Sequence, residues 1–228
     1  MRILGVTWSV VEHLRDKIIT GELAAGKKLN EIELSSQLGI SRAPLREAFR
    51  ILEEGHLVAS VPRKGCYVSD VSLEDFKAFY QAREMVECYS IDLIKEKKIT
   101  AFPNIAQTLH ECSGVAVPPQ NDRGKKLVYL RLFAKFHEKL VETAGNRQLI
   151  SFYRKISLNL SRYQFMYAYL PGLTTASQAG HSEILTLIEK REYERSKQLL
   201  RDHIKHFVNL MEPEMLSNIK AEDERGNS

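Results

Sequence analysis

The sequence has few of the features that mark secreted, membrane-spanning or zinc-knuckle proteins. Its only cysteines, Cys66, Cys88 and Cys112, are an odd number without metal-binding spacing, so neither a disulfide framework nor a zinc knuckle is expected. The apolar run near the N-terminus is too short for the core of a signal peptide, and no later run is long enough to span a bilayer. We therefore expect a cytoplasmic protein that does not enter the membrane.

Motifs typical of enzymes are also scarce. The chain has no glycine-rich phosphate loop, no serine or cysteine nucleophile motif, and no internal repeat. Its 228 residues, 43% hydrophobic and 27% charged, are typical of an ordinary globular protein with room for two domains. A net charge of +4 permits a polyanionic partner without requiring one, so the placement of the cations matters more than their number.

The segment 30–68 carries the clearest local pattern. Leu34 and Leu38 give a short helix one apolar face, Gly39 ends it, and Ser41 is placed to cap a second helix. That second helix directs Leu45, Phe49 and Leu52 inward and carries Arg42, Arg46 and Arg50 on the opposite face. Two short helices joined by a tight glycine turn predict a helix-turn-helix.

Two short strand-like runs follow this helix pair. Residues 57–61 and 66–68 flank the sequence Pro62-Arg63-Lys64-Gly65, which predicts a β-hairpin wing with two cations at its tip. A helix with cations and small polar groups at its N-terminal end fits the major groove of DNA, where arginine pairs with guanine. The arginine spacing alone leaves a solvated basic surface open as the alternative.

The rest of the chain has helical periodicity without strand patterns. We expect a mainly α fold: an N-terminal winged helix-turn-helix with a small β-hairpin wing in residues 1–70, and an all-α antiparallel helical bundle in residues 71–228. The expected helices cover residues 8–20, 73–98, 103–117, 122–143, 147–170, 181–191 and 192–216.

Three histidines lie on three different predicted helices of the bundle. His137, His181 and His203 each have apolar neighbours and would lie at the edge of an apolar stripe. A single histidine in such a position is more often a packed core or boundary residue than a ligand. Convergence of all three on a metal ion is the alternative that the residues leave open.

The segment 14–68 closely resembles the DNA-binding domain of the GntR family of bacterial winged-helix repressors. The resemblance rests on Gly21-Glu22-Leu23, on residues 38–42 (LGISR) and 44–48 (PLREA), and on Arg63-Lys64-Gly65. It implies DNA contacts at Ser41, Arg42, Arg46, Arg63 and Gly65, and Pro44 and Lys64 complete the predicted DNA-binding set. The chain departs from the pattern at Ile32, where some members have an operator-contacting arginine, and at His56, where glycine is usual.

The second half resembles the all-helical FCD effector domain of GntR regulators of the FadR subgroup. The matching residues are Ala82-Arg83 with Glu87, Phe136-His137 with Gly145-Asn146, His181 with Ile184-Leu185, and Asp202-His203-Ile204. The resemblance implies that His137, His181 and His203 hold Zn or a similar divalent ion such as Ni, and that the ion binds a carboxylate effector. An aspartate ligand should stand four residues before His137, but this chain has Phe133 there. A metal-free pocket in which the histidines bind the effector directly stays open.

Four further residues are candidates for effector binding. The resemblance directs Arg83 at the carboxylate of the effector, whereas its spacing equally allows an ion pair with Glu84 or Glu87. The other three, Arg162, Tyr163 and Tyr167, would line the same cavity or form the edge of the core.

These features together predict a ligand-responsive transcriptional regulator, in this family most often a repressor, and not an enzyme. Its expected partners are a near-palindromic operator in double-stranded DNA, a second copy of the chain in a homodimer, and a small organic acid. A dimer is expected because one winged helix reads only a half-site. The alternatives are a metal-dependent hydrolase with a three-histidine centre, for which no general base is evident, and a DNA-packaging protein without a ligand.

Overall fold

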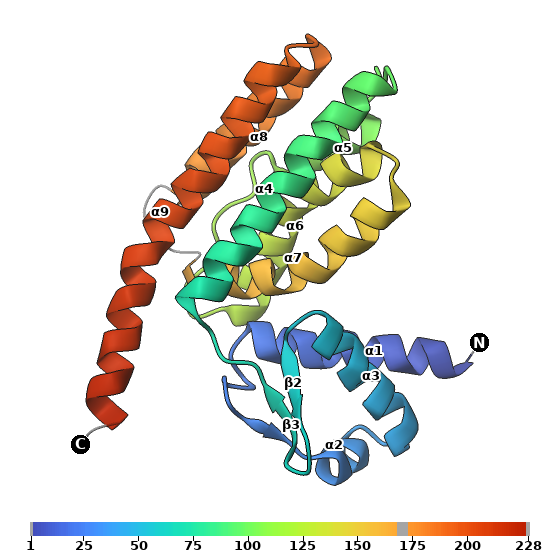
Figure 1. The fold of residues 1–228 in the computed structure, drawn as a ribbon, viewed down its shortest axis with the longest axis vertical. Helices are drawn as coiled ribbons and strands as arrows, with labels where there is room; N and C mark the ends of the chain where they lie inside the picture. Colours follow the sequence, from blue (N-terminus) through green and yellow to red (C-terminus); the bar gives the residue numbers. More distant parts are fainter. Residues whose placement is uncertain (1, 168–172, 227–228) are drawn as a thin grey trace. The chain divides into compact units, whose positions relative to one another are not determined.

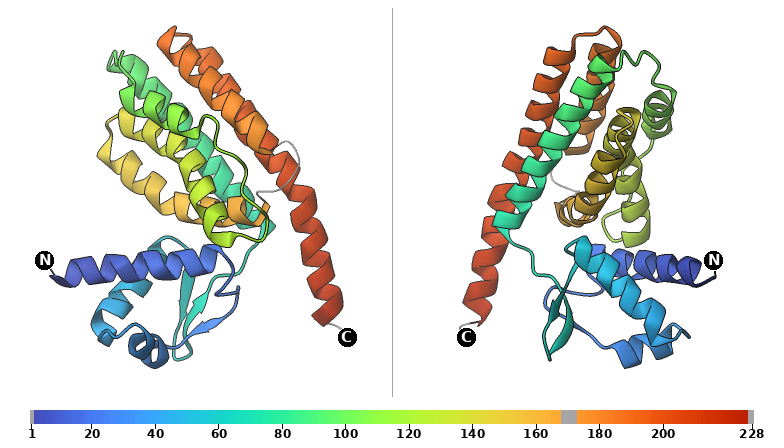
Figure 2. Two further views of the ribbon diagram at one scale, coloured as in Figure 1. Left: turned by 180° about the vertical axis from the view of Figure 1, so that it is seen from behind. Right: turned by 45° about the vertical axis from the view of Figure 1, so that its right-hand side comes forward.

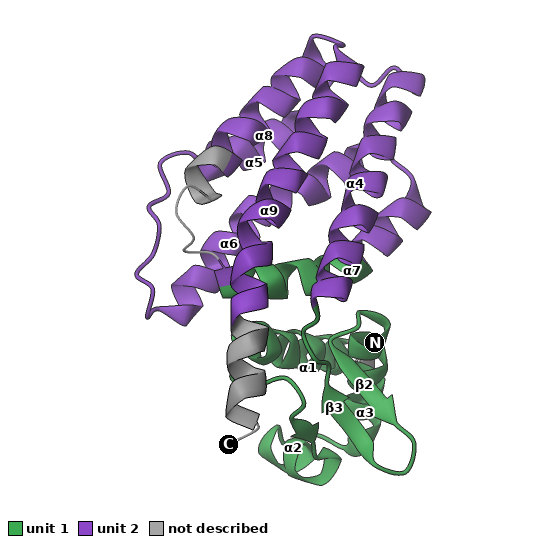
Figure 3. Cartoon of the chain, turned by 60° about the vertical axis from the view of Figure 1, so that its left-hand side comes forward, with its two compact units in different colours: residues 1–72, 155–166 green, residues 73–154, 167–228 purple. Residues whose placement is uncertain are grey.

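A computed structural model of the chain describes residues 2–167 and 173–226, with the side chains of residues 5–167 and 177–217. The chain forms two compact units (Figure 3): unit 1 comprises residues 1–72 and 155–166, and unit 2 comprises residues 73–154 and 167–228. The division of the sequence at residue 70 stays a prediction of domain organisation.

Unit 1 contains three whole helices, part of a fourth (residues 155–166) and a small antiparallel sheet (Figure 1). Its strands lie in the order β1-β3-β2, and β2 pairs with β3 from Val58 opposite Val68 to Val61 opposite Gly65. The predicted hairpin is therefore confirmed, whereas no sequence pattern indicated the short strand β1. The elements are α1 (Arg2–Ile19), β1 (Lys28–Leu29), α2 (Glu31–Gln37), α3 (Arg42–Glu54), β2 (Val58–Val61) and β3 (Gly65–Val68).

The core of unit 1 forms where α1 packs on α3 and the sheet. Leu14 of α1 and Leu45 and Leu52 of α3 are completely buried, as is Leu57 before β2. Burying one such side chain contributes about 1.5–3 kcal/mol relative to leaving it exposed. Helix α1 thus supplies apolar surface that the two short helices lack, and it holds α3 in place.

The ends of the short helices depend on individual residues. Asn30 caps α2, because its side-chain oxygen accepts hydrogen bonds from the backbone N–H groups of Ile32 and Glu33. Ser41 occupies the N-cap position of α3, but its hydroxyl makes no capping hydrogen bond, so that part of the prediction was wrong. His56, directly after α3, has a positive φ of 57°, a conformation that histidine tolerates better than most residues.

Unit 2 is built from helices. In its described part α8 packs on α9, α4 packs on α6 and α9, and α5 packs on α6 and α8. The right-hand view of Figure 2 shows α8 and α9 side by side. The helices are α4 (Leu73–Glu96), α5 (Pro103–Cys112), α6 (Arg123–Thr143), α7 (Arg147–Tyr167), α8 (Leu173–Glu189) and α9 (Tyr193–Gly226), and residues 155–166 of α7 belong to unit 1.

Three helix boundaries in unit 2 differ clearly from the prediction. Helix α5 ends at Cys112 instead of continuing to residue 117. Helix α8 begins at Leu173, well before the predicted start at residue 181. Helix α9 continues through Pro213 to Gly226 instead of ending near residue 216. Residues 168–170, predicted as the end of the preceding helix, lie outside the described residues. No helix in the described ranges combines the length and apolarity needed to cross a membrane.

Candidate DNA interface and histidine pocket

The N-terminal end of α3 presents unengaged polar groups. Ser41 and Arg42 are exposed, and no hydrogen bond or ion pair engages either side chain within the described part of the chain. Pro44 lies in the first turn, where its missing N–H removes no hydrogen bond of the helix. This end of α3 therefore offers backbone N–H groups, a hydroxyl and a guanidinium to an external anion.

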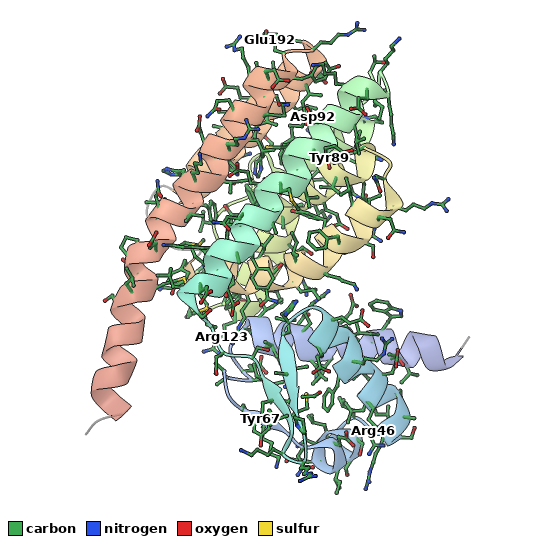
Figure 4. The ribbon with its side chains drawn as sticks, viewed as in Figure 1. Arg46, Tyr67, Tyr89, Asp92, Arg123 and Glu192 are labelled. Atoms are coloured by element: carbon green, nitrogen blue, oxygen red, sulfur yellow. The ribbon has the colours of Figure 1, made fainter. Side chains whose placement is uncertain are left out.

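Further along α3 the cations are paired. Arg46, labelled in Figure 4, is 64% exposed. Its Nε donates to Oε2 of Glu31 on α2 over 2.8 Å. Arg50 pairs with Glu47 and Glu54 of α3 itself. Because an exposed ion pair contributes only about 0–1 kcal/mol, a DNA phosphate or base could replace Glu31 as the partner of Arg46 at little cost.

The wing is joined firmly to α3. Glu53 of α3 accepts two hydrogen bonds from Ser60 of β2, one from the backbone N–H at 2.8 Å and one from the hydroxyl at 3.0 Å. The hairpin turn places Arg63 and Lys64 at the exposed tip, and Gly65 has a φ of 111° that favours glycine. The groove between α3 and the wing has a volume of about 520 Å³, and Arg46 and Arg63 both line it.

The predicted DNA-binding residues therefore fall into two groups within unit 1. One group lies in the first turns of α3 and the other at the tip of the wing, and six of the seven are exposed, Pro44 being partly covered. Ile32 is 62% exposed on α2, directly after Glu31, which pairs with Arg46. The groups are Ser41, Arg42, Pro44 and Arg46, and Arg63, Lys64 and Gly65.

The three predicted histidines meet in unit 2. His137 of α6, His181 of α8 and His203 of α9 each offer one nitrogen, and these nitrogens lie within 4.8 Å of one another. The Nε2 atoms of His181 and His203 are 3.2 Å apart. Gly180 allows His203 to come this close to α8, since a β-carbon there would lie 3.1 Å from Nδ1 of His203.

A buried carboxylate holds the orientation of the first histidine. Oε2 of Glu87 lies 2.7 Å from Nδ1 of His137, while Oε1 accepts from Nε of Arg83 at 2.8 Å and from the hydroxyl of Tyr153 at 3.1 Å. With Nδ1 engaged, His137 presents Nε2 to the other two histidines. Carboxylates in this position fix the tautomer of metal-binding histidines. Sequence reasoning identified Glu87 only as a partner of Arg83, because fifty positions separate it from His137.

Burial keeps the three imidazoles neutral. Burial lowers the pKa of His137 and of His181 well below 6.5, and it lowers the pKa of His203 to about 4. The positive charge of Arg83 lowers all three pKa values further. Burial raises the pKa of Glu87, opposed by Arg83. Neutral imidazoles can bind a metal without first losing a proton.

The donor set fits a divalent cation. Two ligands bound at about 2.0–2.1 Å in a tetrahedral zinc site lie about 3.4 Å apart, close to the 3.2 Å between Nε2 of His181 and Nε2 of His203. Among the described residues, the set of possible ligands at this point consists of the three histidines. Phe133, which stands at the position of the expected aspartate ligand, has an uncharged side chain and cannot bind the ion. It is buried against Tyr129, with ring centroids 4.6 Å apart. The remaining coordination positions would be filled by water or an external ligand.

Of the four predicted effector residues, the structure places Arg83 in the same network as the histidines. Arg162 instead donates to the backbone carbonyl of Ser69 at 2.8 Å, and the hydroxyl of Tyr163 donates to the carbonyl of Ser72 at 3.4 Å, both within unit 1. Tyr167 is buried in unit 2. The role of these three residues in effector binding stays a prediction.

A winged helix with an exposed cationic helix end, in one chain with a helical unit that buries a cluster of three histidines, is typical of two-part bacterial gene regulators. Residues 7–68 match the family described as "Bacterial regulatory proteins, gntR family", and residues 78–206 match the FCD domain. The chain belongs to the GntR family of bacterial regulatory proteins and carries an FCD domain.

Curated relatives agree with this assignment. The chain is 24% identical over 193 residues to the HTH-type transcriptional regulator YdhC of Bacillus subtilis (strain 168), covering 85% of each protein. It is 23% identical over 206 residues to the HTH-type transcriptional repressor RspR of Escherichia coli (strain K12), covering 89% of this chain and 87% of the relative.

Solved structures share the fold. A GntR transcriptional regulator from Rhodococcus sp. RHA1 superposes with a TM-score of 0.69 at 22% identity, covering 90% of this chain and 96% of the other. McbR/YncC of E. coli superposes with a TM-score of 0.71 at 16% identity, covering 92% and 98%. The matched domains and relatives are transcriptional regulators, so the chain is a transcriptional regulator with an effector-binding FCD domain and not an enzyme.

Proposed function

We propose that this regulator is a repressor of the FadR subgroup that binds a near-palindromic operator as a homodimer and releases it when a small organic acid binds. The observation that carries the proposal is the exposed N-terminal end of α3, where Ser41 and Arg42 have no partner among the described residues and Arg46 has only an exposed one. Residues 1–70 would bind DNA, and residues 71–228 would bind the effector and the second copy.

The DNA contacts follow from the chemistry of each group. Arg42 and Arg46 suit bidentate pairing with guanine in the major groove, while the hydroxyl of Ser41 and the N-terminal amides of α3 suit a phosphate. Arg63 and Lys64 at the wing tip suit the neighbouring backbone or minor groove, and Gly65 permits close approach. One chain reads one half-site, so two-fold symmetry of the operator would follow from a dimer.

The DNA proposal is tested by selecting bound sequences from random duplex DNA. The affinity of the protein for the most enriched sequence is then measured at several salt concentrations. Arg46→Ala should lower the affinity by about 1–3 kcal/mol if Arg46 contacts a base, with relaxed preference at that position. The matched control is Arg195→Ala, which removes an exposed arginine of unit 2. Recovery of no preferred sequence would disprove specific operator binding and leave the DNA-packaging alternative.

In the proposed sensor, a divalent ion such as Zn or Ni is held by His137, His181 and His203. Such an ion would supply positive charge for binding the carboxylate of the effector. The site itself has no unbalanced negative charge that could offset a dication, because Arg83 and Glu87 are paired with each other and the imidazoles are neutral. A buried dication would therefore be stabilised by an anion from outside, which favours an organic acid as the effector.

The sensor proposal is tested by elemental analysis of the purified protein and by thermal unfolding with zinc chloride, with and without acetate, succinate or citrate. We expect zinc to raise the melting temperature and a carboxylate to raise it further. His181→Ala should abolish both shifts, whereas His110→Ala, an exposed histidine on α5, should leave them unchanged. Protein that binds neither zinc nor any carboxylate would disprove the sensor while leaving the DNA proposal intact.

A further inference from the structure

Helix α7 contributes to both compact units. The boundary between the units falls within it, so that Arg154 belongs to unit 2 and Lys155 to unit 1 (Figure 3). The helix is continuous from Arg147 to Tyr167. A continuous α-helix resists stretching and bending over this length, so a displacement of its first half is transferred to its second half.

The first half of α7 takes part in the histidine network. Tyr153 is 4% exposed and donates its hydroxyl to Oε1 of Glu87 at 3.1 Å. The other oxygen of that carboxylate lies 2.7 Å from Nδ1 of His137. Any change in the orientation of His137 therefore reaches α7 through two consecutive buried hydrogen bonds.

The second half of α7 packs against the C-terminal end of α3. The side-chain amide of Asn159, 3% exposed, donates to the carbonyl of Gly55, the residue that caps α3. Leu158 lies so close that a β-carbon on Gly55 would be 2.5 Å from its Cδ1 atom. Lys155 pairs with Glu54, the last residue of α3, at 3.1 Å.

These contacts would be kept if α7 moved. A buried amide donor that loses its acceptor retains the full cost of its lost hydration, so Gly55 follows Asn159 more readily than it separates from it. Arg162, 5% exposed, adds a second bond of this kind to the carbonyl of Ser69, just after β3. The C-terminal end of α3 and the end of the wing are thus both attached to one face of α7.

We propose that Tyr153 and Asn159 are positioning residues through which α7 couples the histidine cluster to operator affinity: Tyr153 contacts the cluster through Glu87, and Asn159 sets the position of α3 through Gly55. This inference rests on the proposed function, because it concerns how the sensor acts on the DNA-binding helix.

The test is a double-mutant cycle read out as affinity for the selected operator, with no added effector. Tyr153→Phe removes the hydroxyl that bonds Glu87, and Asn159→Asp replaces the amide donor with a group of the same shape that cannot donate. We expect Tyr153→Phe to change operator affinity about fivefold or more, and to change it less than about twofold in the Asn159→Asp background. Ser151→Ala, which removes an exposed hydroxyl of α7, is the control and should change nothing.

Each outcome decides the matter. Equal effects of Tyr153→Phe in the two backgrounds, or no effect in the wild-type background, would overturn the inference. If circular dichroism shows Asn159→Asp unfolded, Arg162→Gln replaces it in the cycle and the same criterion applies. A wild-type protein that selects no operator would instead disprove the proposed function, so the two failures are distinguishable.

Discussion

At the scale of single residues, glycine and histidine control the geometry of the pocket. Gly180 lies inside α8 with an ordinary helical backbone, so its absent side chain matters for space and not for conformational freedom. The ring of His203 occupies the position that a side chain at residue 180 would need. The distance between the imidazoles of α8 and α9 therefore depends on this glycine.

We predict that Gly180→Ala weakens zinc binding by about tenfold without destabilising the fold. The β-carbon would displace the ring of His203 by a few tenths of an ångström, and displacing a ligand support typically costs about 10–100-fold in metal affinity. Alanine in a helix is more favourable than glycine by about 0.5–1 kcal/mol, which offsets the crowding. Zinc titration and urea unfolding measure the two effects, and Gly124→Ala in α6 is the control. Unchanged zinc affinity would contradict the prediction.

The cysteines provide a prediction based on pKa. Burial raises the pKa of Cys66 and of Cys88 to about 11 and also raises that of Cys112. At pH 8, Cys66 and Cys88 are therefore thiolate in only about one molecule in a thousand. We expect Ellman's reagent to label the three thiols slowly in the folded protein and at once in urea.

The raised pKa values of these thiols also determine how the stability of the fold changes with pH. A thiol whose folded pKa exceeds its unfolded value keeps its proton where the unfolded chain loses it, so unfolding becomes easier as the pH rises from 9 towards 11. Rapid labelling of a full thiol equivalent at pH 8 would show that one of these side chains is accessible.

Single residues were predictable where their type carries the chemistry. The three histidines and the arginines of α3 were identified because their residue types match the resembled families, whereas their spacing alone left a packed core or a solvated basic face open. The bond from Glu87 to His137 was missed because it joins two helices, and sequence spacing carries no information on which helices pack together. The sequence did not reveal that the hydroxyl of Ser41 makes no capping hydrogen bond. The N-cap position determines the backbone conformation of Ser41 but not its side-chain rotamer.

At the scale of elements, α3 and the wing behave as one piece because Glu53 joins them to each other. We predict that Glu53→Ala lowers the free energy of unfolding by about 1 kcal/mol, since it removes two charge-assisted but solvent-exposed hydrogen bonds. Operator affinity should fall several-fold as the wing tip loses its fixed position. Ser60→Ala keeps the backbone bond and should have roughly half the effect on stability. Urea unfolding and DNA titration would measure both quantities, and equal losses in the two variants would contradict this account.

The ion pair between α2 and α3 leads to a predicted increase in operator affinity, in contrast to the loss expected for Glu53→Ala. Glu31 holds Arg46 at 2.8 Å and places a negative charge beside the proposed DNA interface. Glu31→Gln should therefore increase operator affinity, because it frees Arg46 and removes repulsion of the phosphates. The gain should shrink at high salt, where exposed charges are screened. Glu22→Gln, which breaks the exposed pair with Lys17 elsewhere in unit 1, is the control. Weaker binding of Glu31→Gln would show that Glu31 orients Arg46 for DNA instead of competing for it.

The elements themselves were largely predictable, because the helices have amphipathic periodicity and end at glycine or proline. The strand β1 was not, since two residues give no alternation to detect. The apolar periodicity of α4 also misleads at Met85 and Tyr89, which are 61% and 48% exposed. A sequence pattern shows that a residue is apolar but not that another element covers it.

At the scale of the whole molecule, the proposed dimer predicts how operator affinity depends on the spacing between the two half-sites. Two symmetry-related winged helices should require half-sites separated by a fixed number of helical turns of DNA. Insertion of about half a turn, 5 base pairs, between the half-sites should reduce affinity to that of a single half-site, and about a full turn should partly restore it. Band-shift titrations on spacer variants measure this. Affinity independent of spacing would contradict a rigid dimer.

The change in pattern after the wing, where strand-like runs give way to long helices, is the basis for predicting two domains divided at residue 70, and that division stays a prediction. The assignment of residues 155–166 to unit 1 was not predictable. Their periodicity continues that of residues 147–154, and nothing in the pattern marks the point where the contacts of α7 change. The contacts of Leu158 and Asn159 with Gly55 join segments about a hundred residues apart. Local sequence patterns give no information on contacts between segments so far apart in the chain.

The way α7 is shared has a practical consequence for protein engineering. A truncated DNA-binding fragment that stops at Ser72 would lack Leu158, which packs on the core of unit 1, and would leave the carbonyls of Gly55 and Ser69 without their side-chain donors. Such a fragment should express poorly or aggregate, whereas appending residues 155–166 through a flexible linker should recover a soluble, cooperatively folding product.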